Sequence, residues 1–67
     1  MMITKLEDQD IGRWIKYVEF DGSTSSGKIK SFNNETQIAW VVYDCGGNWS
    51  DYRNYTGQAT SYRDLKF

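Results

Sequence analysis

The chain has 67 residues and a formal net charge of −1, with eight Lys or Arg against nine Asp or Glu. It has one cysteine and no histidine, which excludes an intrachain disulfide, a Ser-His-Asp or Cys-His catalytic site and a histidine-based metal site. We therefore expect a single domain over residues 1–67 that is not an enzyme and has no cofactor, with a core rich in its three Trp, five Tyr and three Phe.

No apolar run reaches the length of a membrane span, and residues 1–10 lack the apolar core of a signal peptide. We therefore expect a cytoplasmic protein without a membrane partner. The balanced charge also disfavours general nucleic-acid binding, which is typical of strongly basic domains.

Residues 1–10 are a lead-in from which Leu6 should pack on the core, while residues 7–10 are too polar to belong to the core. After a turn at residues 10–12, the first strand is expected over residues 13–20, with Ile15 and Tyr17 facing inward. A bulge is the alternative that would turn Val18 or Phe20 inward. Residues 21–26 (DGSTSS) are expected to be a flexible connector.

Residues 27–43 carry the strongest hairpin signal. GKIKSF alternates in polarity, QIAWVVY is rich in β-branched and aromatic residues, and Asn33 and Asn34 between them tolerate the positive φ of a tight turn. Alternation predicts Gly27 and Ile29 inward and Lys28, Lys30 and Phe32 outward. The strand over 37–43 is apolar on both faces, so we expect the core on one face and a folded-over loop on the other.

Residues 44–56 (DCGGNWSDYRNYT) form a long aromatic-rich connection. Ser50 could cap a helical turn on which Trp49, Tyr52 and Tyr55, spaced by three, share one side. The rings are either a lid over the preceding strand or a binding patch. Cys45 is expected to be a small, partly buried hydrophobe, and Asp44 and Asp51 to be loop or capping residues.

A short strand over 57–60, a single turn at 61–64 capped by Ser61 and Asp64, and a last strand over 65–67 complete the chain. This order predicts an all-β fold, a small five-stranded SH3-like barrel in which the last strand pairs with the first. An oligonucleotide-binding barrel is the competing fold, but it usually needs a longer chain and a larger helix.

The sequence also resembles small SH3-like proteins of phage and prophage origin, largely of unassigned function. The resemblance lies in GRWIKY, GKIKSFN, VVYDC, NWSDYRNYTGQAT and DLKF, at residues 12–17, 27–33, 41–45, 48–60 and 64–67. It implies a viral or prophage origin, with the protein in the host cytoplasm or associated with the virion, and it implies no catalytic residues.

The leading functional hypothesis is a non-enzymatic module that binds a host or virion protein, because aromatic residues dominate interface hot spots. The expected binding residues are Trp49, Tyr52, Tyr55, Phe32, Lys28 and Lys30. The alternative is a single-stranded nucleic-acid-binding barrel, in which bases stack on Phe32 or Trp14 beside Lys16, Lys28 and Lys30.

Two further alternatives are an aromatic cage for a methylated cation, built from Tyr17, Tyr43, Trp49 and Asp44, and a homo-oligomeric structural or accessory protein whose exposed rings form the interface. The sequence leaves the partner and the oligomeric state open.

Overall fold

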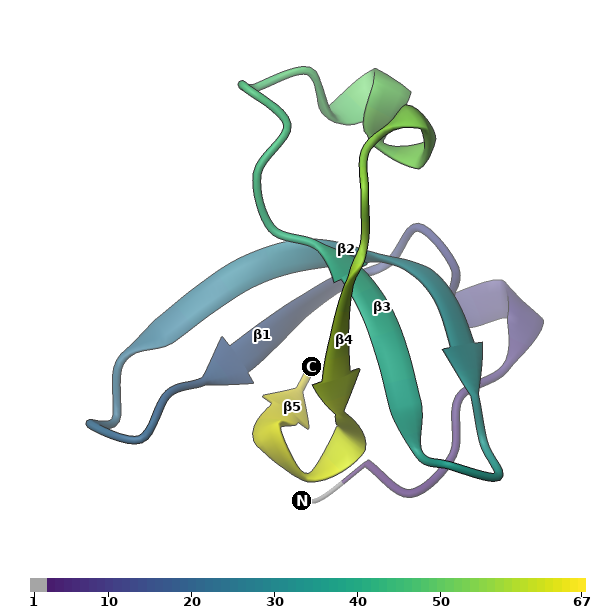
Figure 1. The fold of residues 1–67 in the computed structure, drawn as a ribbon, viewed down its shortest axis with the longest axis vertical. Coiled ribbons are helices and arrows are strands. Elements are labelled where there is room, and N and C mark those ends of the chain that lie inside the picture. The colour runs from purple at the N-terminus through teal and green to yellow at the C-terminus, as the bar shows by residue number, and fades with distance from the viewer. Residues whose placement is uncertain (1–2) are drawn as a thin grey trace.

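The computed structural model describes residues 3–67, which form one five-stranded antiparallel sheet with three short 3-10 turns (Figure 1). The strands are β1 (Trp14–Val18), β2 (Thr24–Asn33), β3 (Ile38–Val42), β4 (Gln58–Ser61) and β5 (Leu65–Lys66), and the turns are η1 (Asp8–Asp10), η2 (Trp49–Asn54) and η3 (Tyr62–Asp64). The strand order is β4-β3-β2-β1-β5, so the last strand pairs with the first as predicted. No ladder joins β4 to β5 within residues 3–67, so the structure confirms a small all-β sheet protein without showing a closed barrel.

The first hairpin is longer than the sequence indicated. Residues 24–26, predicted to belong to a flexible connector, instead pair with β1 from Val18↔Thr24 to Lys16↔Ser26. The connection shrinks to residues 19–23, where Gly22 takes a φ of +90° that favours glycine. Phe20 lies in this turn and is fully exposed, and pairing along β1 is regular, so the bulge that would have turned Phe20 or Val18 inward does not exist.

The second hairpin contains a bulge that the alternation did not reveal. The register of β2 against β3 shifts between Ile29 and Ser31, so Lys30 is an extra residue and the facing pattern reverses after it. Gly27 and Ile29 are buried as predicted, but Phe32, predicted to face outward, packs against the core. In the turn, the residue with positive φ is Gln37 (φ 55°), not an asparagine.

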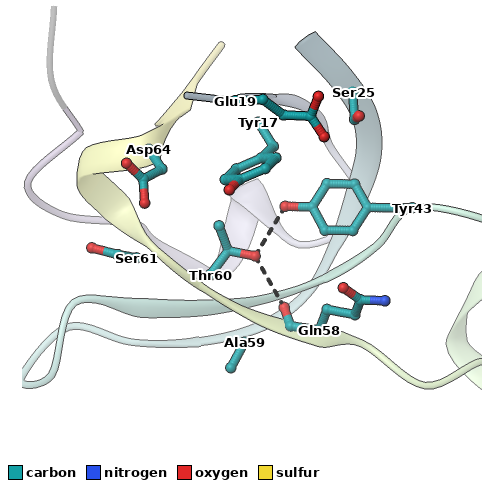
Figure 2. A pocket seen from close by; sticks show the side chains of 9 residues that line it. All are labelled: Tyr17, Glu19, Ser25, Tyr43, Gln58, Ala59, Thr60, Ser61 and Asp64. Atoms are coloured by element: carbon teal, nitrogen blue, oxygen red, sulfur yellow. Dashed lines mark hydrogen bonds between the residues drawn. The ribbon is translucent and has the colours of Figure 1, made fainter. Parts of the chain in front are cut away.

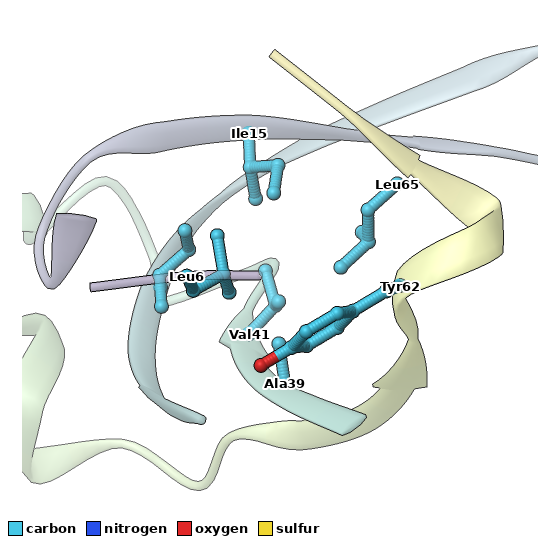
Figure 3. Packing of buried hydrophobic residues seen from close by; sticks show 7 residues of the cluster. Leu6, Ile15, Ala39, Val41, Tyr62 and Leu65 are labelled. Atoms are coloured by element: carbon cyan, nitrogen blue, oxygen red, sulfur yellow. The ribbon is translucent and has the colours of Figure 1, made fainter. Parts of the chain in front are cut away.

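The main core lies on the concave side of the sheet, where side chains from the lead-in segment, the strands β1, β2, β3 and β5, and the turn η3 meet (Figure 3). Its buried members are Leu6, Ile15, Ile29, Ala39, Val41, Tyr62 and Leu65. Leu6 and Ile15 are each 1% exposed, which confirms both as inward-facing residues. Tyr62 enters this core from η3 and is 1% exposed.

The lead-in segment is held against the core by Asn34. The Leu6 N–H donates to Asn34 Oδ1 (2.9 Å), the Asn34 Nδ2 donates to the Leu6 carbonyl (2.9 Å), and the Tyr62 hydroxyl donates to Asn34 Oδ1 (2.8 Å). Residues 7–10 stay outside both hydrophobic core clusters, as predicted, although Asp10 is only 8% exposed. Its carboxylate accepts from the Glu7 N–H and pairs with Arg13 Nη1 at 3.2 Å, which makes its burial tolerable.

Residues 44–56 form a cover over the other face of β3, near the top of Figure 1. Val42, Cys45 and Tyr52 are buried together there, with Trp49 packed against them, so the predicted loop over the second face of this strand is confirmed at Val42, while Ile38 and Trp40 are only partly buried. Cys45 is 2% exposed, more deeply buried than expected. Asn48, not Ser50, precedes η2, and neither it nor Ser61 before η3 makes a side-chain capping bond.

Candidate functional site

Three of the six predicted binding residues come together on the outer face of the sheet. The Lys28 Nζ lies 5.2 Å from the centre of the Trp14 ring and 5.4 Å from that of Tyr52, and Trp49 packs on Trp14 with ring centroids 4.6 Å apart. Tyr52 is only 7% exposed, so it acts as a lid residue and not as a free contact surface. Trp14, which belonged to the alternative hypothesis, is the most exposed ring of this group, at 50%.

The other three predicted residues do not join this group. The Lys30 Nζ donates to the Tyr55 carbonyl at 2.8 Å and so ties the end of the long connection to the sheet. Lys30 also borders a shallow depression beside Trp40, while Phe32 packs against the main core. Tyr55 is 36% exposed. The six residues therefore do not make one continuous site.

A pocket of about 380 Å³, more enclosed than the depression beside Trp40, combines two aromatic rings with charged groups (Figure 2). We call it the tyrosine pocket; it is lined by Tyr17, Glu19, Ser25, Tyr43, Gln58, Ala59, Thr60, Ser61 and Asp64. Tyr17 and Tyr43 meet edge to face, with ring centroids 6.0 Å apart and planes at 61°. The volume falls at the lower end of the range typical of small-ligand sites, about 300–1,000 Å³.

Hydrogen bonds hold one wall of the tyrosine pocket in place. The hydroxyl groups of Tyr43 and Thr60 share a hydrogen bond of 2.9 Å, and the Thr60 hydroxyl lies 3.3 Å from the Gln58 carbonyl, to which it donates (Figure 2). Burial raises the pKa of Tyr43 above its ordinary value, opposed by the bond to Thr60 and reinforced by the negative charge of Asp64. The Tyr43 phenol therefore stays neutral, and its ring presents its π-electrons to the pocket.

The charged groups that line the tyrosine pocket are all acidic. Glu19 directly follows β1 and Asp64 comes from η3, and among residues 3–67 no Lys or Arg lines the pocket. The Glu19 carboxylate also accepts a hydrogen bond from the Ser23 hydroxyl, which fixes it at the rim. Two rings and two carboxylates give this pocket a negative potential that suits a cationic group.

This arrangement corrects the aromatic cage suggested by the sequence. Tyr17 and Tyr43 do come together, but Trp49 packs on Trp14 on the outer face, and the Asp44 carboxylate accepts from the Gly46 N–H within its own loop. The pairing Tyr17↔Leu65 brings the adjacent Asp64 to the tyrosines. The i, i+2 spacing of Tyr17 and Glu19 was the signal available in the sequence.

Comparisons with protein-family models, curated proteins and solved structures find no match for this chain. Within residues 3–67, no three or more His, Cys, Asp or Glu residues cluster in a way that could hold a metal ion. None of the helical segments in the described part of the chain has the length and apolar character needed to cross a bilayer.

Proposed function

We propose that this domain is a non-catalytic protein-binding module, and that the tyrosine pocket receives a cationic side chain, Lys or Arg, of the partner protein. The observation that carries the proposal is the edge-to-face pair of Tyr17 and Tyr43 with two carboxylates and no lining cation. A cation held over an aromatic ring gains about 0.5–2 kcal/mol, depending on how far it is desolvated. The carboxylates add attraction that is weaker at high salt because the pocket is open.

A protein segment is favoured over a free small molecule because the pocket lies beside a sheet edge. Gln58, Thr60 and Ser61 line the pocket and belong to β4, whose only partner strand within residues 3–67 is β3. The outer edge of β4 can therefore hydrogen-bond to an extended peptide while one side chain enters the pocket. Side-chain insertion would give specificity, and main-chain pairing would give affinity.

The proposal extends to the fold class and the source of the partner. The strand order β4-β3-β2-β1-β5 and the single turn η3 between β4 and β5 support assignment to the SH3-like barrels. The resemblance to phage and prophage proteins supports a host or virion protein as the partner.

A peptide titration followed by NMR tests the proposal. Short Gly/Ser peptides with a central Lys, Arg or uncharged norleucine are added to ¹⁵N-labelled protein. We expect saturable shifts of the amide signals of Ser25, Thr60 and Asp64 with the cationic peptides only. Asp64→Asn and Glu19→Gln should each weaken binding several-fold, whereas Glu35→Gln, an exposed acid in the β2–β3 turn, should not. Equal binding of the norleucine peptide, or unchanged affinity in both pocket variants, would contradict the proposal.

A further inference from the structure

The outer face of the sheet carries a group of lysines around one half-exposed indole. Trp14 and Lys16 alternate onto the same face of β1, and the register places Lys28 opposite Trp14 and Lys66 opposite Lys16. Lys16 and Lys66 are exposed, and Trp14 is 50% exposed. We call these four residues the lysine face.

The charges of Lys16 and Lys66 do not stabilise the fold, whereas the Lys28 ammonium contacts the Trp14 and Tyr52 rings. Lys16 and Lys66 lie directly opposite each other on neighbouring antiparallel strands, an arrangement that destabilises a sheet. Within residues 3–67 the one ion pair is Arg13–Asp10, so no carboxylate neutralises these lysines. Where β1 pairs with β2 and β5, the outward positions hold no acid; they are Trp14, Lys16, Val18, Thr24, Ser26, Lys28 and Lys66. A chain with net charge −1 thus concentrates positive charge on one face.

Trp14 is held in place as a platform in the middle of this charge. Its ring rests on Trp49, at 4.6 Å between centroids and an interplanar angle of 59°, and the Lys28 ammonium lies 5.2 Å from its centre. One side of the indole is thus supported by the cover over β3, while half of its surface stays in contact with water. A supported, exposed indole next to ammonium groups suits a ligand that alternates flat rings with anions.

We propose that the lysine face binds single-stranded nucleic acid, with one base stacked on Trp14 and the neighbouring phosphates paired with Lys16, Lys28 and Lys66. A single strand is favoured over a duplex because stacking needs an unpaired base, and a sheet face has no projecting helix to enter a groove. The site is independent of the tyrosine pocket, since Tyr17 alternates with Trp14 and Lys16 and points to the opposite face of β1.

Fluorescence anisotropy tests this inference. A fluorescein-labelled oligothymidylate is titrated with the whole protein, and its affinity is measured between about 20 and 200 mM salt. Neutralising three phosphates predicts a slope of log K against log salt of about −2, and Lys16→Gln or Lys66→Gln should each reduce it by about 0.7. Trp14→Ala should weaken binding about tenfold. Lys5→Gln, an exposed lysine of the lead-in segment, is the control for loss of one charge and should have little effect.

Three results would overturn the inference. One is absence of binding at the lowest salt. Another is an oligonucleotide affinity of the Lys16→Gln and Lys66→Gln proteins equal to that of the wild type. Because Lys16 and Lys66 are exposed, these variants should stay folded, so the result is informative even if the Trp14→Ala protein unfolds. The third is equal binding of duplex DNA or heparin together with an unchanged affinity in a folded Trp14→Ala protein, which would indicate a general polyanion surface without stacking. Glu19→Gln should leave oligonucleotide binding unchanged and so separates this face from the tyrosine pocket.

Discussion

Replacement of Asn34 by Ala should destabilise the domain far more than its position in an exposed turn would indicate. The change removes three hydrogen bonds, two to the main chain of Leu6 and one from the Tyr62 hydroxyl. Each such bond contributes a net ~0.5–1.5 kcal/mol, and a buried group left without a partner costs more. Asn34 itself is exposed, so water can replace part of what is lost. We therefore expect a loss of about 2–3 kcal/mol, of which part reflects release of Leu6 from the core.

Urea and thermal unfolding followed by far-UV circular dichroism measure this loss. For a domain of this size, 1 kcal/mol corresponds to about 4–8 °C in melting temperature, so the melting temperature should fall by about 8–24 °C. The double variant with Tyr62→Phe should show a coupling energy of about 1 kcal/mol, because the two side chains share a bond. Asn48→Ala is the control, since that exposed side chain makes no cap hydrogen bond to η2 and its loss should cost less than about 0.5 kcal/mol. An Asn34→Ala protein as stable as the Asn48→Ala protein would refute the role assigned to this residue.

Two further predictions concern tyrosines. Tyr52→Ala should lower the free energy of unfolding by about 3 kcal/mol, because it removes a buried ring from the cover over β3. Tyr55→Ala should cost less than about 1 kcal/mol, because that ring is more exposed. Equal urea midpoints for the two variants would show that the cover is not part of the folded core. Burial raises the pKa of Tyr43 and Tyr62, so the unfolded chain releases their protons first and stability should fall as pH rises above about 10. Tyr43→Phe should reduce that alkaline loss, as measured by unfolding between pH 9 and pH 11, and an unchanged pH dependence would contradict the assignment.

The sequence predicted the features that depend on local pattern. Polarity alternation around Ile29 and the two apolar faces of residues 37–43 identified the second hairpin, and the apolar tail at Leu65 identified the last strand. The inward positions of Ile15 and Leu6 followed from the same reasoning.

The features that the sequence did not predict depend on single inserted residues or on partners far away in the chain. One extra residue at Lys30 reverses the facing of Phe32, and nothing in the alternation marks it. Asn34 looked like a turn residue, because its partners Leu6 and Tyr62 are each 28 positions away. The tyrosine pocket is assembled from several strands and turns, so no single stretch of sequence contains its pattern.

Because Cys45 is buried, the reactivity of its thiol reports local opening of the chain. It is the one cysteine in the sequence, and its thiol lies beneath Tyr52 and beside Val42. A maleimide or aromatic disulfide reagent can reach the sulfur only after the segment over β3 lifts away. Its labelling rate in native buffer therefore measures the equilibrium for this sub-global event, separately from complete unfolding.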